Sequence, residues 1–225
     1  MTAYFHRLDD LLRGHSAITQ SGRVPRAALW LAAQVLVFGV AYGTAMGTFG
    51  GVLGERFWQV AYSAAKVPLL LLVTFCIGLP SFFVLNTLYG LRDDFGEAVR
   101  ALLAAQAGMT LILASLAPFT MLWYASSADY VGATLFNGVM FAVATFSAQW
   151  LLRAFYRPLV QRQPRHRWLL RAWLAIYAFV AVQMAWVLRP FIGDPSQPVQ
   201  FFRDDAWGNA YVVVANLIWE TVRRW

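Results

Sequence analysis

Long continuous runs of apolar residues, separated by short polar stretches, make up most of the chain. A helix needs about 20 such residues to cross the hydrocarbon core of a bilayer. The runs are unbroken rather than alternating, which predicts helices and excludes a β-barrel. The sequence therefore predicts an all-α polytopic transmembrane bundle. We expect five spans, over 27–48, 66–90, 99–124, 130–152 and 168–188.

The polar segment before the first run has an amphipathic pattern of its own. At helical spacing, Asp9, Asp10 and Arg13 share one face, and the opposite face is apolar. The apolar face consists of Tyr4, Phe5, Leu8, Leu11 and Leu12. This pattern is typical of a helix at the membrane interface. We expect residues 1–26 to form a cytoplasmic segment and the first span to be a retained anchor.

The last segment, 207–225, allows two interpretations. Its apolar positions recur with the period of a helix, at Trp207, Tyr211, Val214, Ile218, Val222 and Trp225. The opposite stripe is Asn209, Asn216, Glu220 and Arg223. The pattern favours an interfacial helix over a sixth span. The chain is then one membrane domain, 1–225, in which 27–188 form the five-span bundle and 189–225 an extracytoplasmic loop and interfacial helix.

Composition and charge restrict the class of protein further. Hydrophobic residues make up 60% of the chain and charged residues 13%, whereas about a quarter of the residues in soluble domains are charged. The net charge of +7 comes from arginines beside the predicted spans, so we expect no nucleic-acid partner. Arginine and alanine are abundant and lysine occurs once, which indicates a GC-rich bacterial genome.

The distribution of basic residues predicts the orientation. Twelve Lys and Arg residues fall on one side of the five spans and six on the other. Cytoplasmic loops carry the excess of basic residues, so we expect a cytoplasmic N-terminus and an extracytoplasmic C-terminus. Residues 153–167 then face the cytoplasm and 189–205 face outside. These features predict a multi-pass protein of the bacterial inner membrane.

Neutral residues fill the polar positions in the cores of the predicted spans, where ionisable groups are costly. They are Gln34, Asn86, Gln106, Asn137, Gln149 and Gln183. The pattern argues against a proton-coupled carrier or a voltage sensor. His6, His15 and His166 lie in the polar flanks without metal-site spacing, so we expect them to be solvated. We expect no catalytic residue, cofactor or metal, and a buried Cys76.

The acidic pair Asp93 and Asp94 precedes the third span. Paired carboxylates can bind a divalent cation, but Asp94 and Glu97 also have the spacing of a capping box. Acidic side chains are favourable at the positive end of the helix dipole. We therefore expect capping rather than metal binding.

Glycines recur at every fourth residue of the first span, at Gly39, Gly43 and Gly47. This spacing places them on one helix face, where the backbones of two helices can approach closely. We expect a packing seam there. Its partner stays open: another helix of the chain, a second copy, a different subunit or a permeating solute.

The loop after the fifth span, "RPFIGDPSQPVQFFRDD" at 189–205, contains three prolines that hold it extended. Phe191, Phe201 and Phe202 provide apolar anchors. Two interpretations are open. The phenylalanines dock on a partner, or they dip into the membrane interface.

Residues 66–124 carry a recognisable order of features. The span "KVPLLLLVTFCIGLPSFFVLNTLYG" is followed by a short loop and by "DDFGEAVRALLAAQAG", which leads into the next span. This junction resembles that of Yip1-type five-span membrane proteins, in which a glycine, an aromatic residue and "E-x-x-R" open the third helix. The tail "RPFIGDP…FFR" is similar to that of uncharacterised bacterial five-span proteins. The resemblance implies a non-enzymatic, helix-associating membrane protein and transfers no catalytic residue.

Two functions fit these features, and neither is enzymatic. The first is a membrane scaffold or accessory subunit that packs through small-residue helix faces with itself or with a larger complex. The alternative is a channel or facilitator, or a membrane-permeabilising oligomer, for a neutral or anionic solute. Its polar lining would consist of Gln34, Asn86, Gln106 and Asn137. The expected partners are the lipid bilayer and membrane subunits.

Overall fold

The computed structural model describes residues 2–15, 24–204, 206–213, 219 and 223, and this part of the chain forms helices and no strand. Five of its helices are long and apolar enough to cross a membrane. They are α3 (Val24–Gly47), α4 (Arg56–Leu88), α5 (Phe95–Ser126), α6 (Tyr130–Arg162) and α7 (His166–Leu188). The predicted all-α polytopic bundle is confirmed.

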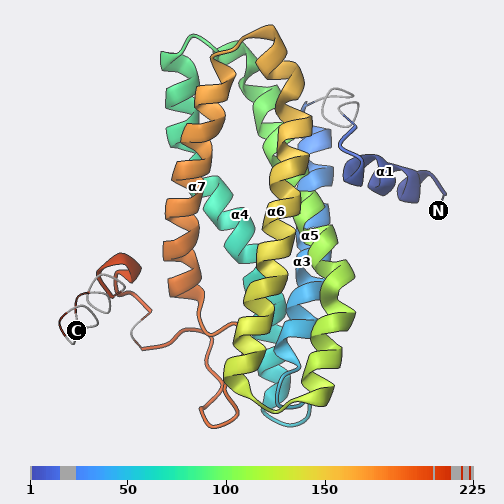
Figure 1. Ribbon diagram of the computed structural model, residues 1–225, viewed down its shortest axis with the longest axis vertical. Helices are drawn as coiled ribbons and strands as arrows, with labels where there is room; N and C mark the ends of the chain where they lie inside the picture. Colours follow the sequence, from blue (N-terminus) through green and yellow to red (C-terminus); the bar gives the residue numbers. More distant parts are fainter. Residues whose placement is uncertain (1, 16–23, 205, 214–218, 220–222, 224–225) are drawn as a thin grey trace.

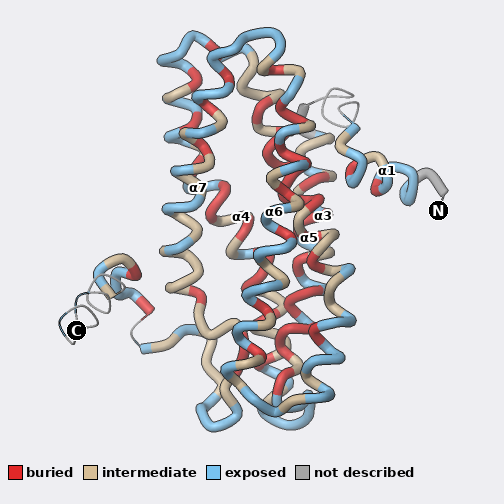
Figure 2. Tube along the Cα trace, in the orientation of Figure 1, coloured by how far each residue is buried: buried red, intermediate tan, exposed pale blue. Residues whose placement is uncertain are grey.

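The five long helices form an incomplete ring (Figure 1). α3 packs along both α4 and α5; α6 packs on α5, and α7 packs on α4. The two ends of this series, α6 and α7, hardly touch each other. Figure 2 shows buried residues along α3 and α5, whereas most of α7 is exposed or half-buried. The hydrophobic core therefore lies around α3 and α5, and the ring is open between α6 and α7.

Two helices extend well beyond the predicted spans. α4 begins at Arg56 rather than at residue 66, and α6 continues to Arg162, so only 163–165 connect α6 to α7. The prediction that residues 153–167 form a loop between the fourth and fifth spans is therefore wrong. Apolar runs mark the part of a helix that crosses hydrocarbon, but arginine and glutamine are also good helix formers. Pro158 lies inside α6 without ending it.

The extension of α4 changes where one charge lies. Lys66, expected at the edge of a span, is inside α4 and completely buried. Lys66 is therefore a buried ionisable residue within a helix long and apolar enough to cross a membrane. Cys76, expected to be buried, lies on the exposed face of α4. In a bilayer that face meets lipid, where a small apolar side chain is equally suitable.

The N-terminal helix α1 (Thr2–Leu12) lies outside the bundle and across its axis (Figure 1). Leu8 and Leu11 are buried against the bundle, while Phe5 is 63% exposed. The Tyr4 hydroxyl donates to Oε1 of Gln34 in α3 at 2.6 Å. The amphipathic pattern thus predicts this helix, but only Leu8 and Leu11 of its apolar face are buried, whereas Phe5 and Leu12 are exposed.

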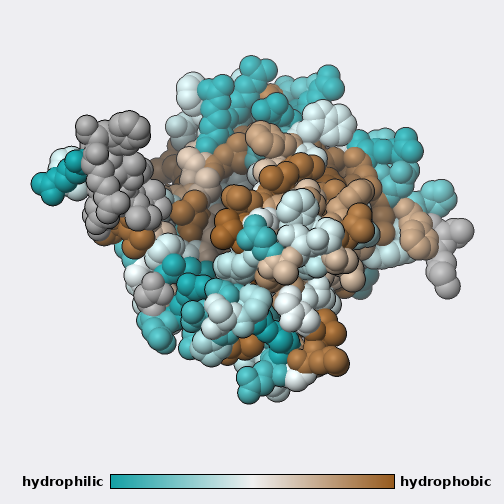
Figure 3. Space-filling view, turned by 60° about the horizontal axis from the view of Figure 1, so that its bottom comes forward, coloured by the Kyte–Doolittle hydropathy of each residue, from teal (hydrophilic) through white to brown (hydrophobic). Residues whose placement is uncertain are grey.

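The two ends of the bundle are more polar than its middle. Figure 3, which turns the lower end of Figure 1 forward, shows a hydrophobic band between hydrophilic regions. About half of the predicted terminal helix over 207–225 lies outside the described residues. Within it, residues 210–213, 219 and 223 are described as helical. The choice between an interfacial helix and a sixth span therefore stays open.

Candidate functional site

The glycine seam is filled by α4 of the same chain. A Cβ atom on Gly39 would lie 3.1 Å from Cβ of Pro68, and one on Gly47 would lie 2.7 Å from Cα of Val60. A Cβ atom on Gly43 would collide with the carbonyl oxygen of Ser63. The backbones of α3 and α4 approach as closely as small residues allow. The seam is thus an internal contact and is not available to a second copy or to another subunit.

A polar network joins α3, α5 and α6 near one end of the bundle. The Tyr42 hydroxyl donates to Oδ1 of Asn137 at 3.0 Å, and Nδ2 of Asn137 donates to the Tyr124 hydroxyl at 2.7 Å. Tyr124 in turn donates to the Met46 carbonyl oxygen at 3.3 Å. Each member has partners, as buried polar groups require. The network therefore holds three helices together.

The four residues predicted to line a pore do not share one cavity. Gln34 is bonded to α1, and Nδ2 of Asn86 donates to the Phe82 carbonyl oxygen in its own helix. Gln106 and Asn137 line two neighbouring cavities on α5 and α6. The position of each residue within an apolar run predicts its depth in the membrane. It does not predict the direction in which the side chain points.

The larger of these cavities, which we call the crevice, lies between α4, α5, α6 and α7 and has a volume of about 720 Å³. Leucine, alanine and aromatic side chains form most of its wall. The polar side chains that line it are all neutral: Gln106, Thr145, Gln149 and Tyr177. The crevice arises because α6 and α7 do not close the ring.

Two polar groups in the crevice have unused hydrogen-bonding capacity. The Tyr177 hydroxyl is directed at the Gln106 side chain. However, neither this hydroxyl nor Oε1 of Gln106 reaches a partner at good hydrogen-bond geometry within the described residues. Buried polar atoms are usually paired. Both atoms are fully buried beside the crevice.

Beyond the crevice, α6 and α7 border a second hollow of about 440 Å³. Its charged side chains are Arg153, Arg157 and Arg167, which together we call the arginine mouth. All three are exposed. No hydrogen bond or ion pair involves their guanidinium groups within the part of the chain that the structure describes. These guanidinium groups are available to an anion.

Asp94 organises the protein beside the arginine mouth. Its Oδ2 atom lies 3.0 Å from Nε2 of His166, and its Oδ1 atom lies 3.6 Å from Nη1 of Arg162. Arg162 also donates to Oε1 of Glu97 at 2.7 Å. This cluster links η1 (Arg92–Asp94) and α5 to the ends of α6 and α7.

Two predictions about this cluster are wrong. The Asp94 side chain makes no capping hydrogen bond to α5, because its oxygens face His166 and Arg162. His166, expected to be solvated, is completely buried and its ring stacks edge-on against Tyr156, with ring centroids 5.8 Å apart. The extension of α6 brings Tyr156 to this position, which apolar runs alone do not reveal.

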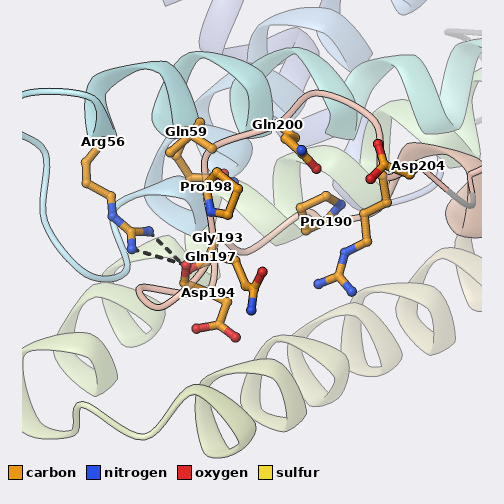
Figure 4. A pocket seen from close by; sticks show the side chains of 11 residues that line it. Arg56, Gln59, Pro190, Gly193, Asp194, Gln197, Pro198, Gln200 and Asp204 are labelled. Atoms are coloured by element: carbon orange, nitrogen blue, oxygen red, sulfur yellow. Dashed lines mark hydrogen bonds between the residues drawn. The ribbon is translucent and has the colours of Figure 1, made fainter.

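At the opposite end, α4 fixes the proline-rich loop over 189–205. Nζ of Lys66 donates to the Pro190 carbonyl oxygen at 2.7 Å, and Ser63 donates to that of Phe191. Arg56 donates to the carbonyl oxygens of Gly193 and Asp194 at 3.3 and 3.2 Å (Figure 4). These bonds provide partners for backbone carbonyl groups of an irregular segment, as buried polar groups require.

The loop phenylalanines contact the chain itself. Phe201 packs edge-on against Tyr62, at 5.2 Å between ring centroids, and lies 4.9 Å from Nζ of Lys66. Phe191 packs against a buried hydrophobic cluster, and Phe202 stays 41% exposed. The first two side chains therefore anchor the loop on α4 and the bundle, so neither is free for a partner.

Between this loop and α4 lies a polar pocket of about 320 Å³ (Figure 4). Gln59 and Arg56 face it from α4, and Asp194 borders it from the loop. Hydrogen bonds from the Ser196 backbone and hydroxyl, with the charges of Arg203 and Arg56, hold the pKa of Asp194 below its ordinary value. The pocket is closed on one side by the bonds that fix the loop.

Sequence reasoning missed the crevice and the arginine mouth. In the sequence, the arginines indicate only the orientation of the chain. The cavity depends on how far α6 and α7 diverge, which the sequence does not show. A usable signal was the i, i+4 series Gln149, Arg153 and Arg157, which puts polar and basic side chains on one face of α6. Comparisons with protein-family models, with curated proteins and with solved structures find no match, so the geometry of the chain itself carries the functional argument.

Proposed function

We propose that the protein is a non-enzymatic, multi-pass membrane protein that holds an amphiphile from the bilayer in the crevice. The observation that carries the proposal is the crevice itself. Its volume of about 720 Å³ falls within the range of about 300–1,000 Å³ that is typical of ligand sites. Its wall is apolar with a few hydrogen-bonding groups, the combination that suits a chain with a polar part.

The position of the crevice supports uptake from the lipid phase. α6 and α7 border it and hardly touch, so the ring of helices is open on that side. The polar side chains that line it, such as Gln106 and Tyr177, are neutral at physiological pH. Such groups orient a ligand without supplying an acid–base pair. We therefore favour binding over catalysis.

The same proposal includes an orientation. The arginine mouth and Arg162 lie at one end of the bundle, and cytoplasmic ends carry the excess of basic residues. We propose that this end faces the cytoplasm and that the loop over 189–205 faces the outside of a bacterial inner membrane. The non-enzymatic role agrees with what the resemblance to Yip1-type proteins implies.

Native mass spectrometry tests the proposal with one plugged crevice and one control. Ala181 lines the crevice, so Ala181→Trp fills part of it. Ala175 lies on the exposed face of the same helix and does not line the crevice. The protein released from mild detergent should carry adducts with the mass of lipids. Ala181→Trp should lose them and Ala175→Trp should keep them; equal adducts in both variants would refute the proposal.

A membrane scaffold or accessory subunit is the second candidate. α7 favours it, because only 6% of the most apolar stretch of this helix is buried. An apolar face that meets lipid can also pack against a helix of another subunit. The glycine seam does not serve this purpose, since α4 fills it. Co-purification of a second chain in mild detergent would support the scaffold, and a monomeric particle would oppose it.

A further inference from the structure

We propose that the amphiphile is an anionic phospholipid whose phosphate is bound by the arginine mouth while an acyl chain occupies the crevice. This inference rests on the proposed function and names its ligand. It combines two cavities that differ in chemistry: one holds three guanidinium groups and the other is apolar. A phospholipid has the same two parts in the same order.

The two cavities lie in sequence along the same pair of helices. On α6, Thr145 and Gln149 line the crevice, and Arg153 and Arg157 line the hollow beyond it. Residues four apart share one helix face, so these four side chains form a single row. On α7, Arg167 borders the hollow, and the crevice follows deeper along the same helix.

The charge around the arginine mouth selects an anion. No Asp or Glu occurs between residues 130 and 193, so neither α6 nor α7 supplies a carboxylate. Asp94 and Glu97, which lie at the same end of the bundle, already pair with Arg162 and His166. Arg162 is therefore neutralised within the protein, whereas the guanidinium groups of the arginine mouth are not. Guanidinium groups bind phosphate oxygens in pairs, which makes arginine well suited to this ligand.

The same charge disfavours zwitterionic lipids. A choline or ethanolamine headgroup would bring a cation next to three guanidinium groups. A phosphatidylglycerol headgroup carries no such cation. Basic pockets between membrane helices at the cytoplasmic side are suited to anionic headgroups for this reason.

Gln149 adds a contact at the correct depth. It lies four residues before Arg153 on α6, which corresponds to about 6 Å along the helix axis. Its amide borders the crevice and forms no hydrogen bond to any described residue. An amide N–H at this depth can donate to an ester carbonyl oxygen just below the phosphate. Along α6, the arginines thus lie level with the phosphate, Gln149 with the ester, and the crevice with the acyl chain.

Lipid titration of the delipidated full-length protein, followed by native mass spectrometry, tests this inference. The probes are phosphatidylglycerol and phosphatidylcholine with identical acyl chains. We expect phosphatidylglycerol to bind about ten- to a hundredfold more tightly, given the contribution of each basic residue near a membrane surface. The variant Arg153→Gln/Arg157→Gln/Arg167→Gln should bind both lipids equally.

The matched control is Arg92→Gln/Arg165→Gln/Arg171→Gln, which removes the same charge from exposed positions outside the hollow. It should keep the preference; loss of the preference in this control would overturn the inference. Equal binding of both lipids to the parent protein would overturn it too, but leave the proposed function intact. Binding of neither lipid would refute both. Displacement of phosphatidylglycerol by inorganic phosphate would assign the arginines to a soluble anion instead.

Discussion

Nε2 of His166 lies 3.0 Å from Oδ2 of Asp94, and this contact joins the start of α7 to the turn that opens α5. His166 is completely buried, and its ring also packs against Tyr156 of α6. A single carboxylate thus links three elements at the end of the bundle that carries the arginine mouth. This contact fixes the start of α7 beside Arg167 of the arginine mouth.

Removing that carboxylate should destabilise the bundle. Asp94→Ala leaves His166 buried without its partner, and such a loss costs about 1–3 kcal/mol. The measurement is the thermal unfolding midpoint in detergent. Asp93→Ala is the matched control, because the neighbouring Asp93 is exposed, and changes at such positions usually stay within about 0.5 kcal/mol. Equal midpoints for the two variants would contradict the structural role of Asp94.

The α3–α4 seam should not tolerate a methyl group at its centre. Gly43→Ala places Cβ against the Ser63 carbonyl oxygen, and overpacking of this kind costs about 1–3 kcal/mol. Gly138→Ala on α6 meets no atom within 4 Å, so helix propensity alone should leave it neutral or slightly more stable. Thermal unfolding of both variants measures the difference. If Gly43→Ala unfolds at the same temperature as the parent protein, the backbones of α3 and α4 do not approach as closely as the structure shows.

Lys66 should control the docking of the loop over 189–205 on α4. Lys66→Met removes the hydrogen bond to the Pro190 carbonyl oxygen, and a charged hydrogen bond contributes about 1.5–3 kcal/mol. A cysteine in place of Ile192, which is 4% exposed, reports loop opening in a Cys76→Ser background. Its labelling rate should rise in Lys66→Met. The rate should not change in Leu69→Met, a conservative change on the exposed face of the same helix.

The orientation predicts opposite labelling of two exposed glutamine positions. Gln161 lies at the arginine-rich end of α6, and Gln197 lies in the loop over 189–205. Single cysteines at these sites, again with Cys76→Ser, should react with a membrane-impermeant reagent from opposite sides. The cysteine at 197 should react in intact cells and that at 161 only after permeabilisation. If both cysteines react from the same side, the chain does not cross the membrane an odd number of times between them, and the expected orientation is refuted.

Apolar runs were sufficient to predict the five spans, because burial in hydrocarbon demands them. They could not predict where the helices end. Lys66 and Arg56 belong to α4 although neither is apolar, since a helix continues into the polar region without an apolar sequence. Pro158 is a similar case: it lies within α6 but looks like a break in the sequence.

The contacts between helices were less predictable than the helices. The glycines at 39, 43 and 47 correctly indicated a close approach, but several helices carry small residues and the spacing does not choose among them. Ser63 and Ala64 provide the facing surface. Arg153 and Arg157 lie four residues apart on one face of α6, but only the packing of α6 and α7 brings Arg167 to the same hollow.

Photo-crosslinking tests the central claim, occupation of the crevice by a lipid chain, most directly. The probe is a phospholipid with a photoreactive group halfway along one acyl chain, incorporated into vesicles with the full-length protein. If the chain enters the crevice, the crosslinked peptides should contain residues 102–109 of α5 and 174–185 of α7, with the label on crevice-lining side chains such as Gln106 and Ala181. Ala181→Trp should abolish this labelling. Crosslinks confined to the outer helix faces, for example at Phe146 and Trp168, which are 78% and 63% exposed, would contradict the claim.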